Sequence, residues 1–298
     1  MSPSRKRAAV EELESSFGAS ERRACAVIDQ PRSSQRYQRR RNDEEQPLVN
    51  RMVELARRQP RHGYRMITGT LRAEGWFVNR KRVYRLWRRE GLKVRQIRRK
   101  RRRLGASINS CTRRRAACPN DVWAWDFVFD RTSNGRQLNW LSIVDEYTRE
   151  CLCLSVGRRF TSLDVIDELV SLSGSRGLPQ HIRSDNGPEF IAGEIRAWLQ
   201  RLGVETLYVE PGAPWENGYA ESFHSRFRDE FLSMEEFDSL SAAKRLTTLW
   251  RDDYNHRRPH SSLGYRPPVG FAADWTASIP VAALPPFQQS NPISVTQP

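Results

Sequence analysis

The chain has no hydrophobic run long enough to span a bilayer, and its first residues lack the apolar core of a signal peptide. It has only five cysteines in 298 residues, an odd number without regular spacing, which favours reduced thiols over a disulfide framework. These absences predict a soluble, cytoplasmic protein with no membrane partner.

Acidic residues are missing from one long stretch, because none occurs between Glu90 and Asp121. Residues 1–120 hold 33 Lys and Arg against 11 Asp and Glu, whereas residues 121–298 hold 17 against 24. A net charge of +15 that is segregated in this way favours a nucleic-acid-binding half joined to a half with another role. Arginine outnumbers lysine in the basic half, which favours bidentate contacts to phosphate or guanine.

Helical spacing of apolar residues organises the basic half. Residues 1–45 are expected to be an N-terminal helical DNA-binding segment, with two short helices over 20–38 and Ser33 or Ser34 capping the second. Residues 46–92 predict a helix-turn-helix domain, whose last helix follows Asn79 as its cap. The exposed face of that helix carries the cations that we expect to bind DNA: Arg80, Lys81, Arg82, Arg85, Arg88 and Arg89.

Residues 93–119 are expected to be a basic linker, since eight of the eleven residues 93–103 are Lys or Arg. Such a run cannot be buried, so it would be solvated and could lie along a DNA backbone, which would make binding salt-dependent. A nuclear localisation signal is the competing interpretation. The DNA contacts expected here come from Arg98, Arg99, Lys100 and Arg101.

After Pro119 the pattern becomes that of an α/β fold. Three β-rich runs are followed by alternating helices and strands, which predict a mixed five-stranded sheet with flanking helices over residues 120–275. We expect Asp145, at the end of the second strand, to be exposed. Residues 276–298 carry no charge and five prolines, and they predict a disordered tail.

Two aspartates in this half have unusual surroundings. Asp126 interrupts the apolar run VWAWDFVF, both faces of which look buried, so its charge needs a buried arginine, a proton or a metal ion. Asp185 follows a short strand and opens the run SDNGPEF. That run is either a simple turn closed by the aspartate side chain or a functional position at a strand end.

Glu221 is separated from Asp185 by 35 intervening residues and lies in the helix-like segment WENGYAESFHSRFRDEFL. Helical spacing places Arg228 on the same side, where it could meet a neighbouring phosphate. A surface glutamate is the simpler interpretation, and Glu221 has rivals nearby: Glu210, Glu216 and Glu230. Three acids that converge from two strands and a helix can hold a pair of Mg²⁺ ions against a DNA phosphate.

Three runs carry a family resemblance: HIRSDNGPEF, PWENGYAESFHSRFRDEF and YNHRRPHSSLGYRPP. With the run GYRMITGTLRAEGWFVNRKRVYRLWRREGL, they make residues 20–272 resemble the catalytic subunit (OrfB) of bacterial transposases of insertion sequence family three. That family belongs to the retroviral-integrase-like DDE recombinases.

This resemblance implies a ribonuclease-H-like core, with Asp126, Asp185 and Glu221 as a metal-holding triad and Asn186 and Gly187 shaping the turn beside the second acid. It implies double-stranded DNA as the partner, both element ends and target. A homo-oligomer on DNA, an upstream-frame transposase subunit and a place at the bacterial nucleoid are expected with it.

The function that we expect is metal-dependent strand cleavage and strand transfer with two Mg²⁺ ions, for which Mn²⁺ can substitute. One ion would activate water, and later a DNA 3′-hydroxyl, while the other stabilises the leaving oxygen. The alternatives are a metal-dependent nuclease of the same fold and a non-catalytic DNA-binding regulator.

Other chemistry finds less support in the sequence. No zinc is expected, because His62 is the only histidine before the core, whereas retroviral integrases begin with a His/His/Cys/Cys module. Tyr219 would be the nucleophile of a tyrosine recombinase, but we expect it to pack or to stack on DNA. We expect His256 and His260 to fix a turn.

Overall fold

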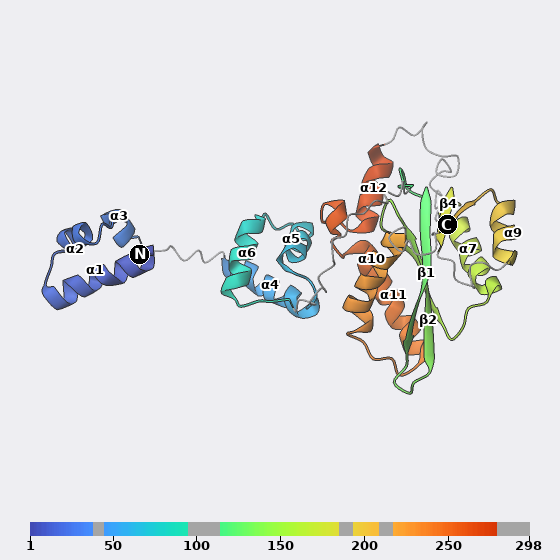
Figure 1. Ribbon diagram of the computed structural model, residues 1–298, viewed down its shortest axis with the longest axis horizontal. Helices are drawn as coiled ribbons and strands as arrows, with labels where there is room; N and C mark the ends of the chain where they lie inside the picture. Colours follow the sequence, from blue (N-terminus) through green and yellow to red (C-terminus); the bar gives the residue numbers. More distant parts are fainter. Residues whose placement is uncertain (38–44, 95–113, 185–192, 209–216, 279–298) are drawn as a thin grey trace, which may run out of the picture. The chain divides into compact units, whose positions relative to one another are not determined.

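The computed structural model describes residues 1–37, 45–94, 114–184, 193–208 and 217–278 (Figure 1). The chain divides into two compact units, Met1–Arg51 and Met52–Pro298. Some positions singled out by the sequence lie outside the described residues: Arg98, Arg99, Lys100, Arg101, Asp185, Asn186, Gly187, Glu210 and Glu216.

The described residues 1–37 form three helices, α1 (Pro3–Phe17), α2 (Glu21–Val27) and α3 (Arg32–Gln35). The sequence reasoning found the last two but missed α1, whose Val10 packs with Ala24 and Cys25 in a small core. The prediction that Ser33 or Ser34 caps α3 is wrong. The helix begins at Arg32, directly after Pro31, so both serines lie inside its short run rather than before it.

Three further helices form the helix-turn-helix region: α4 (Glu45–Arg58), α5 (Tyr64–Ala73) and α6 (Arg80–Arg89). Asn79 caps α6 as predicted, because its side chain accepts a hydrogen bond of 2.9 Å from the backbone N–H of Lys81. The apolar faces are buried through Ile67 and Leu71 of α5 and through Val83, Leu86 and Trp87 of α6. The opposite side of α6 is therefore left to its cations.

The sheet has five strands: β1 (Val122–Arg131), β2 (Gln137–Asp145), β3 (Cys151–Gly157), β4 (His181–Ser184) and β5 (Glu205–Tyr208). Their order is β3-β2-β1-β4-β5. The first three strands pair antiparallel, whereas β4 runs parallel to β1 and β5 parallel to β4. The predicted mixed five-stranded sheet is confirmed.

Helices cover both faces of the sheet (Figure 1). On one face lie α7 (Ser162–Arg176) and α9 (Gly193–Arg201), which pack on Trp123 and Trp125. The other face is covered by α10 (Gly218–Phe227), the π-helix η2 (Arg228–Leu232) and α11 (Leu240–His256), which pack on Val128 and Trp140. β1 is thus buried on both sides, as its sequence predicted.

A short 3₁₀ turn, η3 (Ser261–Leu263), leads into the last helix, α12 (Pro268–Ser278). The first three residues of the segment expected to be disordered are therefore helical, and the rest of that segment lies outside the described residues. None of the helices within the described ranges combines the length and the apolar character that crossing a bilayer requires.

The expectation that Asp145 is exposed is wrong, because only 1% of its surface is accessible to solvent. Its carboxylate accepts backbone hydrogen bonds from Asn120 at 2.7 Å, Tyr147 at 2.7 Å and Thr148 at 2.9 Å. Burial nevertheless raises the pKa of Asp145, against the effect of these bonds. The side chain closes the turn after β2 and is a structural acid.

Candidate active site

Asp126 stands near the middle of β1, opposite Ser142 of β2. Residues alternate between the two faces of a strand, so Asp126 shares with Val128 the face covered by α10. Its side chain is 21% exposed, and its Oδ1 atom accepts a hydrogen bond of 2.7 Å from the backbone N–H of Phe127. Its Oδ2 atom faces a histidine.

That histidine is His224, a residue that the sequence reasoning did not single out. His224 is buried on α10; its Nδ1 atom lies 3.4 Å from Oδ2 of Asp126, and its Nε2 atom lies 2.8 Å from Oγ of Ser142. Burial, with a smaller effect of Arg228, lowers the pKa of His224 to about 4. Oγ of Ser142 also donates to the backbone carbonyl oxygen of Asp126 at 3.0 Å. The neutral ring of His224 therefore packs between Ser142 and the carboxylate of Asp126 without neutralising that carboxylate.

Glu221 is exposed on α10, one helical turn before His224. The opposite side of α10 buries Phe223 and Phe227 against the sheet, and this packing fixes which way Glu221 faces. Asp126 and Glu221 line one cavity of about 690 Å³ together with Arg228, the cation predicted to share the face of Glu221. Two of the three predicted acids are therefore brought together.

The third acid, Asp185, lies outside the described residues. The strand before it, β4, ends at Ser184 and runs parallel to β1, with His181 opposite Val122 and Arg183 opposite Ala124. The strand that ends just before Asp185 is therefore the direct neighbour of β1, which carries Asp126. Within the described ranges, no three histidine, cysteine or acidic side chains are close enough together to hold a metal ion.

Arg61, in the loop after α4, also lines the cavity of Asp126 and Glu221. Its Nε atom lies 3.5 Å from Oδ1 of Asp229, and its Nη2 donates to Oγ of Ser233 at 3.4 Å. In the sequence Arg61 differs in no way from the many other arginines, so it could not be predicted as a cavity residue. The fold brings it to the acids from far along the chain.

Glu230, a rival of Glu221, is held elsewhere. Arg258 donates to both of its carboxylate oxygens, at 2.5 and 2.6 Å, and Nε2 of His62 lies 3.6 Å from one of them. Burial alone raises the pKa of Glu230, but the hydrogen bonds from Arg258 and His62 outweigh burial and lower it to about 2. Glu230 is therefore an ionised structural acid that does not line the cavity of Asp126.

The remaining predicted residues lie apart from the two acids. The guanidinium of Arg149 lies 3.7 Å from the ring centroid of Tyr219, so this ring packs against a cation, as one of the two expected roles requires. His260 contacts Oγ of Ser262 at 2.9 Å and bonds through its backbone to Arg266, so it fixes a turn. The Nδ1 atom of His256 lies 3.1 Å from the carbonyl oxygen of Asp252.

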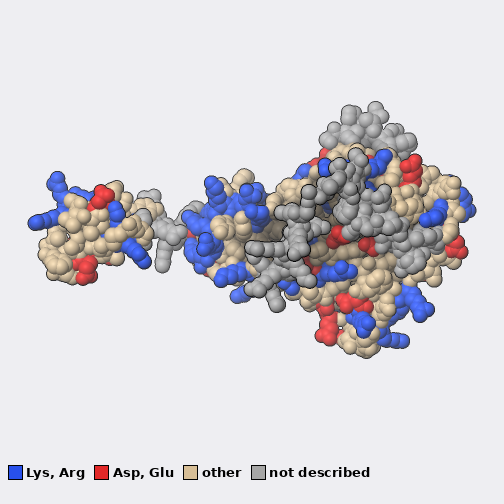
Figure 2. All heavy atoms as spheres, viewed as in Figure 1, with Lys and Arg blue, Asp and Glu red and all other residues tan. Residues whose placement is uncertain are grey.

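The cations predicted to bind DNA on α6 are exposed or half-exposed. Figure 2 shows Lys and Arg side chains gathered over the part of the chain formed by α4, α5 and α6. Exposed on α6 are Arg80, Lys81, Arg85, Arg88 and Arg89, whereas Arg82 is half-buried. The geometry suits contact with a polyanion.

Known families and proteins match most of this chain. Residues 116–214 and 202–268 match the integrase core domain family, and residues 42–101 match the HTH-like domain family. Over 285 residues the chain is 39% identical to the insertion element IS476 uncharacterized 39.2 kDa protein of Xanthomonas euvesicatoria, covering 96% of this chain and 82% of that relative. Over 244 residues it is 30% identical to the transposase InsD for insertion element IS2 of Escherichia coli, covering 77% of this chain and 79% of that relative.

A solved structure, the simian T-cell lymphotropic virus intasome in complex with PP2A regulatory subunit B56 gamma, is also similar. The match has 20% identity and a TM-score of 0.44, and it covers 62% of this chain and 63% of that one. The matches place an HTH-like region before an integrase core of ribonuclease-H-like fold in this chain. The chain belongs to the OrfB transposases of insertion sequence family three, which are DDE polynucleotidyl transferases acting in DNA transposition.

Proposed function

We propose that this transposase cleaves the DNA strand at the ends of its element and transfers it to target DNA, with Asp126, Asp185 and Glu221 as its metal-holding triad. The observation that carries the proposal is that Asp126, on a strand, and Glu221, on a helix, line one cavity. The end of β4 just before Asp185, on the strand next to that of Asp126, supports its inclusion.

The donors suit Mg²⁺, which prefers carboxylate oxygens and keeps several water ligands. Asp126 is partly exposed and Glu221 is exposed, so neither carboxylate is sealed from an entering ion. The neutral ring of His224 adds no positive charge that would repel a cation. When bound, two such ions would lower the pKa of the attacking hydroxyl and neutralise charge on the leaving oxygen.

The protein's own residues would bind and orient the DNA. Arg228 lines the cavity beside Glu221, where its guanidinium can bind a phosphate oxygen next to the cleaved bond. His224 would hold the Asp126 carboxylate in one orientation. Because the attacking group is water or a DNA hydroxyl, no side chain forms a covalent bond to DNA, and Tyr219 stays a packing residue.

Holding the duplex would fall to the basic first half of the chain. The exposed cations of α6 would contact the DNA, and the linker residues Arg98, Arg99, Lys100 and Arg101 would lie along its backbone. Two DNA ends must be held for transposition, so we propose that the chain acts as a homo-oligomer on DNA with an upstream-frame subunit as partner.

The test supplies a pre-cleaved donor end and target DNA with Mg²⁺ or Mn²⁺, with and without the upstream subunit. Joined products are expected, and Asp126→Asn or Glu221→Gln should abolish both cleavage and joining while sparing the binding of element ends. Asp130→Asn, on the same strand as Asp126, is the matched control and should keep activity.

Two outcomes favour the alternatives. Cleavage without any joined product would identify a nuclease of the same fold. Binding with no cleavage under any divalent ion, even with the upstream subunit, would identify a DNA-binding regulator. Full activity of either triad variant would refute the assignment of these acids.

A further inference from the structure

The helix-turn-helix region and the end of the catalytic core meet at Gly69 of α5. A Cβ atom at this buried glycine would lie 3.0 Å from Cβ of Pro259 and 3.0 Å from Cβ of Tyr265, closer than side-chain atoms ordinarily approach. The backbone of α5 therefore packs directly on the turn over residues 259–265. Only glycine permits this approach without a shift.

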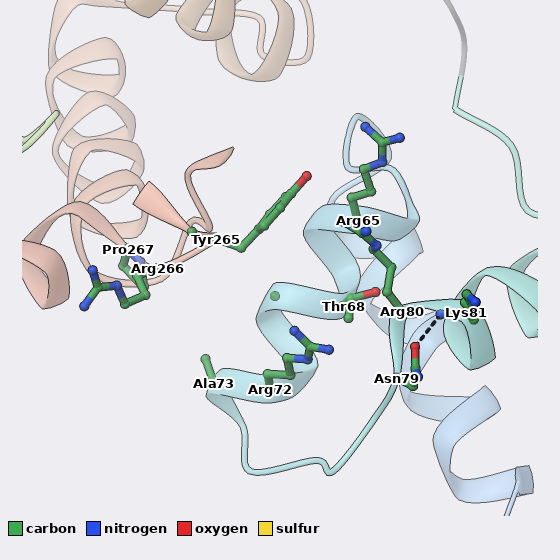
Figure 3. Close-up of a pocket in the computed structure, with 12 residues that line it drawn as sticks. Arg65, Thr68, Arg72, Ala73, Asn79, Arg80, Lys81, Tyr265, Arg266 and Pro267 are labelled. Atoms are coloured by element: carbon green, nitrogen blue, oxygen red, sulfur yellow. Dashed lines mark hydrogen bonds between the residues drawn. The ribbon is translucent and has the colours of Figure 1, made fainter. Parts of the chain in front are cut away.

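Tyr265 sits in that turn with a backbone φ of 66°, in the left-handed region that residues with a Cβ rarely adopt. Its N–H donates to the carbonyl of His260 at 2.9 Å, and the carbonyl of Arg266 accepts from the N–H of His260 at 3.0 Å. These bonds hold the conformation, which directs the ring toward α5 (Figure 3). Conformations of this kind are concentrated at functional sites.

A cavity of about 650 Å³ opens beside this contact, between α5, the start of α6 and residues 264–267 (Figure 3). None of the described residues that line the cavity is acidic. Five of them are cations: Arg65, Arg72, Arg80, Lys81 and Arg266. Such a concentration of charge attracts an anion with several oxygen atoms.

The five cations are not equivalent. Arg72 donates through Nε and Nη2 to the carbonyl of Val78, both at 3.1 Å, and so supports the turn before α6. The guanidinium of Arg266 pairs with Asp274 and, in Figure 3, points away from the cavity. Arg80 and Lys81 are exposed at the start of α6. These two cations are the ones best placed to receive a ligand.

Arg65 connects the two walls. The hydroxyl of Tyr64, and to a lesser extent the neighbouring Tyr265, raises the pKa of Arg65, so its guanidinium stays charged beside the tyrosine of the core. Its Nε atom donates to the Tyr64 hydroxyl at 3.2 Å. Tyr265 thus brings a hydroxyl donor from the core to a cavity whose charge comes from the helix-turn-helix region.

We propose that this cavity binds the sugar–phosphate backbone of DNA, with Arg80 and Lys81 supplying the charge and Tyr265 of the catalytic core contacting the same phosphate. The proposal rests on the proposed function in one respect, that the ligand is the DNA on which the transposase acts. Its consequence is that the core takes part directly in holding the DNA that the helix-turn-helix region binds. The contact would be independent of base sequence.

The test measures binding of the full chain to fluorescently labelled duplexes, an element end and a scrambled sequence, over a series of salt concentrations without divalent metal. The Arg80→Ala/Lys81→Ala variant should weaken binding to both duplexes alike. It should reduce the magnitude of the slope of log affinity against log salt by about one unit, since the loss of one phosphate contact reduces it by about 0.9. Lys244→Ala/Arg245→Ala, two exposed cations of α11, removes the same charge and should leave the slope unchanged.

The shared phosphate is tested by a double-mutant cycle. Tyr265→Phe removes only the hydroxyl and should weaken binding about tenfold in the wild-type background. In the Arg80→Ala/Lys81→Ala background the same change should have little effect, because the phosphate contact is already lost. Gly69→Ala, which separates the two walls, should reproduce the loss caused by Tyr265→Phe.

Thermal unfolding of each variant shows whether weaker binding comes from a lost contact or from a destabilised fold. Tyr265→Phe retains the aromatic ring that packs in the turn. Unchanged DNA binding by Tyr265→Phe would overturn the proposal. Additive effects of Tyr265→Phe and Arg80→Ala/Lys81→Ala on the binding free energy would also overturn it, because they would show that the residues do not contact the same phosphate. An unchanged salt slope in Arg80→Ala/Lys81→Ala would overturn it as well. Failure of wild-type chain to join DNA strands would instead refute the proposed function and leave these binding results intact.

Discussion

Glu221 and Glu230 lie nine positions apart on consecutive helices, α10 and η2, and their surroundings are opposite. Glu221 is exposed in a cavity beside Asp126 and a neutral histidine. Only 9% of the side chain of Glu230 is exposed, and Arg258 donates to both of its carboxylate oxygens. The carboxylate of Glu221 is accessible to solvent, whereas that of Glu230 accepts hydrogen bonds inside the protein.

Charge alone therefore does not identify a metal-binding acid in this chain. A buried carboxylate that an arginine neutralises contributes to the fold, because breaking the pair would leave a charge without compensation. An accessible carboxylate that shares a cavity with a second acid offers oxygen ligands to a cation that enters the cavity.

The largest effect is expected for Glu221→Gln, which keeps the size of the side chain and removes its charge. Strand cleavage should fall by about three orders of magnitude or more, because a catalytic acid acts as part of a unit. The temperature of unfolding should not change, since the side chain is exposed. Gel analysis of cleaved element ends with a parallel thermal melt gives both numbers, and Glu236→Gln, also exposed, is the control.

For Glu230→Ala the effect should appear in stability. Removing one partner of the buried pair with Arg258 should lower the free energy of unfolding by about 3–5 kcal/mol, measured by urea denaturation. Activity per folded molecule should be kept. Glu230→Leu combined with Arg258→Met removes both charges and should recover most of the stability; a double variant as unstable as the single one would contradict this account of the pair.

The same pair predicts a pH dependence. The carboxyl of Glu230 has a pKa of 4.5 ordinarily and of about 2 in the folded protein. Above pH 4.5 its contribution to the free energy of unfolding is complete. As the pH falls from 4.5 to 2, the unfolded chain takes up a proton that the folded chain does not. About 3 kcal/mol is lost over that range.

The midpoint of urea denaturation, measured at several pH values between about pH 5 and pH 2, checks this prediction. This range covers the ordinary and the folded-state pKa of Glu230. The Glu230→Gln variant should lack this part of the acid dependence, whereas Glu236→Gln should keep it. Identical acid profiles for wild type and Glu230→Gln would show that another group carries the effect.

A smaller effect is expected for His224→Gln, which keeps a hydrogen-bonding group beside Asp126 but changes its geometry. A residue that orients a metal-binding carboxylate typically affects activity or metal affinity by about 10–100-fold. We expect the Mg²⁺ concentration for half-maximal cleavage to rise by that factor. A change in stability with an unchanged Mg²⁺ requirement would mean that His224 only fills the core.

The sequence allowed prediction of elements whose signals are local. The alternation around Asp126 predicted a strand buried on both faces, and the position of Asn79 predicted the cap of α6; both were confirmed. The burial of Asp145 was missed because it depends on three backbone N–H groups aligned by the turn. A strand-end aspartate gives no sign of them in the sequence.

Contacts between distant parts of the chain were beyond local patterns. His224 reaches Asp126 only because the phenylalanines of α10 fix its rotation on the sheet. Arg61 reaches the same cavity from the loop after α4, although nothing but its charge distinguishes it from its neighbours. The resemblance of three runs to a family supplied the triad, and the geometry of its surroundings came from the fold.

We propose that Asp126 and Glu221 hold a divalent metal ion and that Glu230 does not. Titration calorimetry of Mn²⁺ into the full chain, in the absence of DNA, tests it directly. Binding is expected for wild type, Asp130→Asn and Glu230→Gln, and it should be lost in Asp126→Asn and Glu221→Gln. Mn²⁺ binding that is undiminished in both of the last two variants would contradict the claim.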